Sequence, residues 1–219
     1  MDLPEESIVT TSQAPHYRGR IHVDRSEIEE RLSELELTFE LIARAAFEGD
    51  VDRKSVPPYG YAGQAEYDAH SRARSVLCEH GGETDGGWHA GYHHNIQVAF
   101  NHSETIAIHA TAGTAGTGKP DGEPHNGSLK GPWSRRASRE SAQLELDVEE
   151  PVDFWWLFTY HDDHGLWSEL YAPIIEDGGR ASGWTERIIL GNLGPGMAPV
   201  RAPQEPHPIP EIEISRRTA

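Results

Sequence analysis

The chain has 219 residues, and its 36 carboxylate side chains against 19 cationic ones give a formal net charge of −17 at pH 7. Such a charge repels phosphate backbones and anionic lipid headgroups, because neutralisation of phosphates by Lys and Arg supplies most non-specific nucleic-acid affinity. We therefore expect no generic nucleic-acid binding and no membrane binding. A protein partner or self-association is the kind of contact that we expect instead.

The length and the cysteine content predict a simple domain organisation. A chain of this length buries enough apolar surface for one domain without disulfides, and Cys78 is the only cysteine. The first residues, Met1–Glu6, lack the basic start and the apolar run of a secretory signal. The sequence predicts a cytoplasmic protein with a single α+β domain at 24–193, an extended N-terminal arm at 1–23 and a Pro-rich, flexible tail at 194–219.

An amphipathic helix is predicted to follow the arm. Ser26 and Glu29 fit the S-x-x-E capping box, and Gly49 is typical of a helix end. Between them, apolar residues recur at steps of three and four: Ile28, Leu32, Leu35, Phe39, Ile42 and Ala46. This stripe predicts packing against the protein's own sheet, with a short coiled-coil dimer as the alternative. After a rigid connection at Val56–Tyr61, a second helix is predicted over Gln64–Cys78.

Period-two alternation begins near residue 95. Asn95–Asn101 and Thr105–Ala110 predict an antiparallel hairpin. The nearly unbroken apolar run Phe154–Phe158 is typical of a central strand covered on both faces. The expected fold is α+β, with two N-terminal helices packed on a mainly antiparallel sheet of about five to six strands. The strands predicted after the hairpin are Gln143–Val148, Phe154–Tyr160, Leu166–Ile175 and Trp184–Leu190.

Prolines define the tail and prevent regular structure there: Pro195, Pro199, Pro203, Pro206, Pro208 and Pro210. The composition is compatible with a solvated tail, which is favoured, or with a polyproline-type arm that docks on a partner. Glu211–Ile214 alternates in polarity and could add to a sheet as an edge strand.

Residues Gly113–Lys119 satisfy the G-x-x-x-x-G-K part of a phosphate-binding loop and follow a predicted strand. The chemistry also needs a hydroxyl for Mg²⁺ after the lysine and a helix N-terminus facing the phosphates. Pro120 stands at the hydroxyl position, and Asp121–Pro124 is unsuited to start a regular helix. We therefore predict no bound cofactor here and a long Gly-rich loop over 113–132.

Thr159–His164 resembles the H-x-H-x-D-H zinc motif of metallo-β-lactamase-type proteins, with Thr159 in place of the first histidine. The resemblance implies further ligands well downstream, where only His207 remains. A turn joining two strands explains the same residues, because Asp and Gly in Asp162–Gly165 supply the required backbone conformations. The turn is the favoured interpretation.

His89, His93 and His94 are the strongest metal candidates, because neutral imidazoles suit Zn²⁺ and a catalytic zinc keeps three protein ligands with one open position. A metal-dependent hydrolase would use these ligands, with a carboxylate such as Glu104 as the base. The neighbouring glycines predict a loop, and Ala90 stands where the H-E-x-x-H motif has its glutamate. A structural or incidental role is favoured, and the zinc site is the alternative.

Arg135, Arg136 and Arg139 form the one basic patch of the sequence, and pairing with the chain's own carboxylates is favoured there over an anion site. No G-x-S-x-G motif occurs, and we assign no catalytic residue. Because each catalytic motif is incomplete, the sequence favours a non-enzymatic protein-interaction or assembly component that acts through the tail or the helix stripe. The alternative is the zinc-dependent hydrolase.

Overall fold

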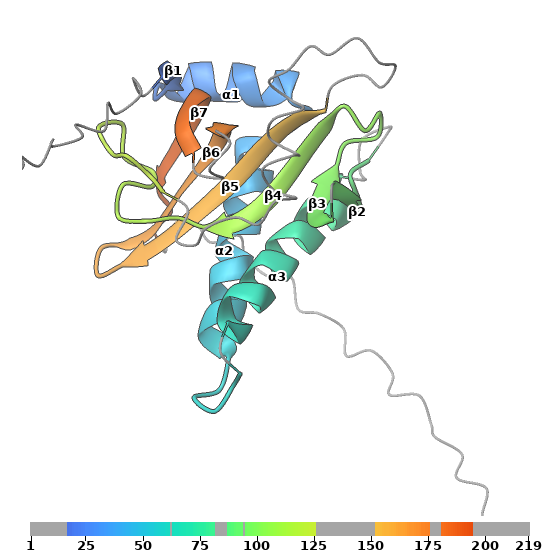
Figure 1. The fold of residues 1–219 in the computed structure, drawn as a ribbon, viewed down its shortest axis with the longest axis vertical. Coiled ribbons are helices and arrows are strands. Elements are labelled where there is room, and N and C mark those ends of the chain that lie inside the picture. Colours follow the sequence, from blue (N-terminus) through green and yellow to red (C-terminus); the bar gives the residue numbers. More distant parts are fainter. Residues whose placement is uncertain are drawn as a thin grey trace, which may run out of the picture.

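A computed structural model describes residues 17–61, 63–81, 87–93, 95–125, 152–175 and 181–194 (Figure 1). These residues form three helices and seven strands, and the fold is α+β as predicted. In chain order the elements are β1 (Tyr17–His22), α1 (Arg25–Glu34), α2 (Phe39–Ser55), α3 (Gln64–Gly81), β2 (His89–His93), β3 (Ile96–Phe100), β4 (Ile106–Ala112), β5 (Asp153–Asp162), β6 (Gly165–Ile175) and β7 (Ala181–Asn192).

The strands form one mixed sheet in the order β1-β7-β6-β5-β4-β3-β2. β1 pairs with β7 and β4 pairs with β5 in parallel, whereas the other neighbouring pairs are antiparallel. β5 lies in the middle, and its run Phe154–Phe158 is buried throughout, which confirms the predicted central strand. The predicted hairpin and the predicted strands near 166–175 and 184–190 are also confirmed.

Two strands lie where the sequence predicted none, so the predicted strand count was too low. β1 occupies Tyr17–His22, inside the segment expected to be an extended arm, so the helices do not precede every strand. β2 occupies His89–His93, which was expected to be a loop. Both are edge strands of the sheet, and β1 pairs with a strand far along the chain, where Arg20 lies opposite Glu186. The six residues of β1 contain no local pattern that would predict pairing with a strand as distant as β7.

The predicted first helix is two helices. Leu35–Thr38 separates α1 from α2, and Glu36 within it has a positive φ of 57°. The hydroxyl of Thr38 accepts a hydrogen bond from the backbone N of Leu41 at 3.1 Å, which caps α2. The chain therefore stops one helix and starts another without losing the apolar stripe.

Both predicted ends of that helix were wrong. The N-cap of α1 is Asp24, so the capping box of Ser26 and Glu29 is not formed. Gly49 lies inside α2, where a Cβ would stand 2.7 Å from the backbone oxygen of Ala69 on α3. This glycine lets the two helices approach closely instead of ending one of them.

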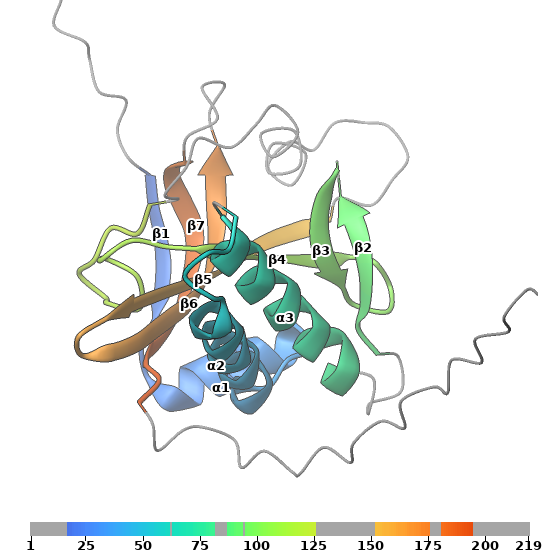
Figure 2. The same ribbon diagram turned by 90° about the horizontal axis from the view of Figure 1, so that it is seen from below.

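The three helices pack on one face of the sheet, which curves around them (Figure 2). All six residues of the predicted stripe are buried in this core, so packing against the protein's own sheet is confirmed and the stripe is not an exposed contact surface. The opposite face carries a second, largely aromatic cluster: Phe100, Phe154, Trp156, Phe158, Tyr171 and Trp184.

Several predictions fall on residues that the structure does not describe. These are the N-terminal arm up to residue 16, the strand Gln143–Val148, the basic patch around Arg135–Arg139 and the tail from residue 195. Within the described ranges, every helix is too short or too polar to cross a membrane.

Candidate functional site

The histidines proposed as zinc ligands lie on the edge strand β2. His89 and His93 share one face of the strand, and each ring contacts the ring of Phe100, with centroids 5.8 and 6.2 Å apart. Four residues of extended strand separate their Cα atoms by about 13 Å, whereas zinc–nitrogen bonds are about 2 Å long. These two side chains do not converge, and His94 lies outside the described residues. No group of three His, Cys, Asp or Glu side chains that could hold a metal ion occurs among the residues described.

Glu104, the candidate base, does lie beside one of these histidines. Its Oε1 is 3.1 Å from Nε2 of His89, and both side chains are exposed. Glu104 has a positive φ of 58° in the turn between β3 and β4. An exposed ion pair of this kind contributes little to the free energy of folding. We interpret it as a surface contact at the edge of the sheet.

The segment that resembles a phosphate-binding loop is held by an internal carboxylate. The backbone N of Gly118 donates a hydrogen bond of 2.9 Å to Oε2 of Glu169, whose side chain is fully buried in β6. No helix follows Lys119 up to the last described residue of this segment, as predicted. The side chain of Lys119 lies over the ring of Trp167, 4.8 Å from its centroid. The loop amide is thus bound to the protein's own anion.

Arg187 completes this buried anchor. Its guanidinium donates to Glu169 at 2.6 Å and, in addition, to the carbonyl oxygens of Gly122 at 2.8 Å and Lys119 at 3.0 Å. Burial raises the pKa of Glu169, while Arg187 and the Gly118 amide oppose that rise. This pair was not predicted from the sequence, although a lone acid and a lone base within two apolar strands were the available signal.

The run that resembles a zinc motif is the turn between β5 and β6, as predicted. Asp162 Oδ1 accepts hydrogen bonds from the backbone N of His164 at 2.9 Å and from the Trp167 indole at 3.0 Å. On the same hairpin, Nδ1 of His161 lies 3.3 Å from Oδ2 of Asp50, a buried residue of α2. These polar groups tie the hairpin to the helices.

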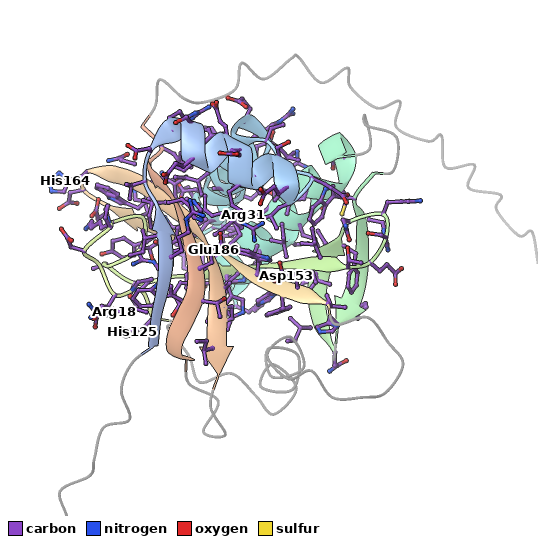
Figure 3. The ribbon with its side chains drawn as sticks, turned by 90° about the horizontal axis from the view of Figure 1, so that it is seen from above. Arg18, Arg31, His125, Asp153, His164 and Glu186 are labelled. Carbon is purple, nitrogen blue, oxygen red and sulfur yellow. The ribbon has the colours of Figure 1, made fainter. Side chains whose placement is uncertain are left out.

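A second polar cluster, also missed from the sequence, lies between α1 and the sheet. Arg31 donates two hydrogen bonds of 2.8 Å to Glu186, and the buried His22 ring places Nε2 2.6 Å from the same carboxylate. An ionised carboxylate only accepts hydrogen bonds, so Nε2 carries the proton. Figure 3 labels Arg31, Glu186 and the nearby Asp153 in the region beneath α1.

Asp153 adds a second carboxyl group to this region. Partial burial raises the pKa of Asp153, whereas the Trp155 indole and the charge of Arg31 lower it and the charge of Glu186 raises it further. Nδ1 of His22 is buried without a hydrogen-bond partner among the described residues and has essentially no contact with solvent. The cluster therefore joins α1, β1 and β7, and no accessible atom of His22 is left for a substrate.

The described surface has one concentration of exposed aromatic rings, at the connection between α2 and α3. This connection projects beyond the sheet (Figure 1). Tyr59 is 98% exposed, Tyr61 63% and Tyr67, on the first turn of α3, 53%. We refer to these three residues as the tyrosine tip. The available sequence signal was the spacing of tyrosines around a proline pair between two helices.

The backbone of the tyrosine tip is ordered by local contacts. The N of Gly60 donates to the O of Pro57 at 2.9 Å, and the N of Gln64 donates to the O of Tyr61 at 3.0 Å. Pro57 and Pro58 lie in the connection between α2 and α3 as predicted, and each proline ring fixes its own φ angle. The rings are thus presented on a pre-ordered turn.

Comparison of the chain with protein-family models, with curated proteins and with solved structures finds no match.

Proposed function

We propose that this chain is a non-enzymatic protein-interaction component, and that the tyrosine tip is its contact surface. The observation that carries the proposal is the near-complete exposure of Tyr59, at 98%, with two further exposed tyrosines beside it. Tyrosine is enriched in protein interfaces, because its ring buries a large area and its hydroxyl still forms hydrogen bonds. Outside the tip, the exposed large hydrophobic side chains of the described residues are Tyr92, at 67%, and Val23, at 49%.

The ordered backbone of the tip favours binding. Association loses free energy when loops and side chains become immobilised, and a turn already held by Pro57, Pro58 and its own hydrogen bonds loses less. A tyrosine has only two side-chain torsions, so its burial in an interface loses little conformational entropy. These features distinguish the tip from a merely solvated loop.

The charge of the chain indicates the kind of partner. With a net charge of −17, the protein repels acidic surfaces over distances comparable to the Debye length. We expect a protein partner whose contact face is neutral or basic. Nucleic acid and membranes remain disfavoured for the same electrostatic reason. The zinc-dependent hydrolase gains no supporting contact from the described residues, since His89 and His93 do not converge.

The proposal is tested by photo-crosslinking from the tip. A benzoylphenylalanine is placed at position 59 and, as the matched control, at position 92, because Tyr92 is also an exposed tyrosine but lies on β2. Proteins crosslinked only from position 59 in the source cells are identified by mass spectrometry and purified. Binding of the purified partner is then measured by calorimetry with Tyr59→Ser/Tyr61→Ser and with Tyr92→Ser.

The expected result is a loss of affinity of about tenfold or more in the double variant, as is usual for interface tyrosines, and no loss in Tyr92→Ser. The substituted side chains are exposed, so both variants should keep the unfolding temperature of the parent protein. Identical crosslinked proteins from positions 59 and 92, or equal affinities of all three proteins, would disprove a contact role for the tip.

A further inference from the structure

The Pro-rich tail leaves the described structure beside the hairpin between β5 and β6. The last described strand, β7, runs back along β6, and the backbone N of Leu193 donates to the O of Leu166 at 2.6 Å. The side-chain amide of Asn192 donates to the O of His164 at 2.8 Å. The chain therefore leaves the sheet beside the hairpin between β5 and β6.

This hairpin contacts the helix that ends at the tip. Leu166 lies opposite His161 in the sheet, and Nδ1 of His161 lies 3.3 Å from Oδ2 of Asp50. Asp50 precedes the last residue of α2, Ser55, by five positions, which is about 8 Å along a helix axis. Direct contacts thus connect the root of the tail to Asp50 of α2, the helix that leads into the tip.

The tail is long enough to reach the tyrosine tip, and its composition suits binding to aromatic side chains. Residues 195–219 number 25, and a polyproline helix rises about 3.1 Å per residue, so the segment spans about 75 Å when extended. Six of these residues are prolines. Aromatic side chains line the sites that bind such segments in other proteins, and the restricted backbone of a Pro-rich segment lowers the entropy lost on binding.

Electrostatics also favours the tail as the occupant. Its three arginines, Arg201, Arg216 and Arg217, balance its three glutamates, so the tail carries no net charge. The remainder of the chain therefore carries the whole charge of −17, and two copies of this remainder repel one another. A neutral segment tethered nearby approaches the acidic body without that repulsion.

We propose that the Pro-rich tail docks on the tyrosine tip of its own chain. This inference rests on the proposed function, because it takes the tip to be a contact surface, and it adds a regulatory contact to it. A partner that binds the tip competes with the tail, so the tail lowers the apparent affinity of the tip for partners until it is displaced.

The test is nitration of surface tyrosines with tetranitromethane, followed by peptide mapping. The full chain is compared with a full-length variant in which Pro203, Pro206, Pro208 and Pro210 are changed to Ser. The parent protein should show nitration of Tyr59 and Tyr61 slowed by about tenfold, since a short tether gives an effective concentration on the order of a millimolar. In the variant this protection should be lost.

Tyr92 is the internal control, because it is exposed on β2 and should react at the same rate in both proteins. Equal nitration of Tyr59 in the two proteins would overturn the proposal. Protection that increases with protein concentration would also overturn it, because the contact would then join different copies. Either outcome leaves the crosslinking test of the tip unaffected, so the two proposals fail independently.

Discussion

Nε2 of His22 lies 2.6 Å from Oε1 of Glu186, a contact between the first and the last strand that the structure describes, 164 residues apart in sequence. Arg31 of α1 holds the same carboxylate with two hydrogen bonds of 2.8 Å. One carboxylate thereby joins α1, β1 and β7. The consequence is that the N-terminal part of the described fold depends on a residue near its C-terminal end.

Glu186→Gln should destabilise the protein by about 2 kcal/mol, because it removes the carboxylate of a largely buried ion pair and leaves Arg31 only the exposed Glu34 as a charged partner. The matched control is Glu34→Gln, since Glu34 accepts from the same guanidinium but is mostly exposed. That change should cost less than about 0.5 kcal/mol. Urea denaturation measures both. Equal effects of the two substitutions would show that burial of the pair does not matter.

The contribution of Glu186 should also depend on pH. Burial raises the pKa of this carboxyl, but hydrogen bonds and charge from Arg31 and His22 outweigh burial and hold the pKa below its ordinary value. A lowered folded-state pKa contributes stability above the unfolded-state value of about 4.3, and this is lost as the pH falls through the folded-state pKa. The difference in unfolding free energy between the parent protein and Glu186→Gln should therefore shrink between about pH 5 and pH 3. A constant difference over this range would contradict the lowered pKa.

Arg187→Lys should destabilise the protein strongly. The guanidinium donates at once to Glu169 and to two loop carbonyl oxygens, and an ammonium group lacks the planar fork that serves all three. Loss of these buried contacts should cost about 3 kcal/mol. Arg18→Lys is the control, because Arg18 pairs with Glu123 on the exposed surface and its replacement should cost less than about 0.5 kcal/mol. A similar midpoint of denaturation for both variants would refute a structural role for the buried anchor.

The fold class and the core were predictable because they follow from local periodicity. The spacing of apolar residues from Ile28 to Ala46 and the apolar run Phe154–Phe158 each predict a buried element without reference to distant residues. Both are buried as expected. β1 was not predictable, because its residues alternate weakly and become a strand only by pairing with β7. Prediction from the sequence therefore succeeded where neighbours in the chain determine the structure.

The polar clusters were unpredictable for a related reason. Glu169 meets Arg187 only because β6 and β7 pair with a defined register, and that pair then binds a loop about fifty residues earlier. The motif at Gly113–Lys119 led us to consider and reject phosphate binding, but nothing in the sequence identified the internal carboxylate of Glu169 that binds this loop. The tyrosine tip was visible as residues in a rigid connection, but its exposure required the structure.

The docking of β1 on β7 depends on Gly19. A Cβ at this position would stand 1.7 Å from the backbone oxygen of Thr185, and that backbone atom cannot rotate away. Gly19→Ala should therefore displace β1 from the sheet edge and destabilise the protein by about 2 kcal/mol or more, within the usual range for overpacking. Gly194→Ala is the control, because nothing lies within 4 Å of a Cβ there. Hydrogen exchange separates local from global effects: faster exchange should appear first at the β1 amides and at their partners on β7. Unchanged protection of β1 in Gly19→Ala would mean that the two strands do not approach each other as closely as described.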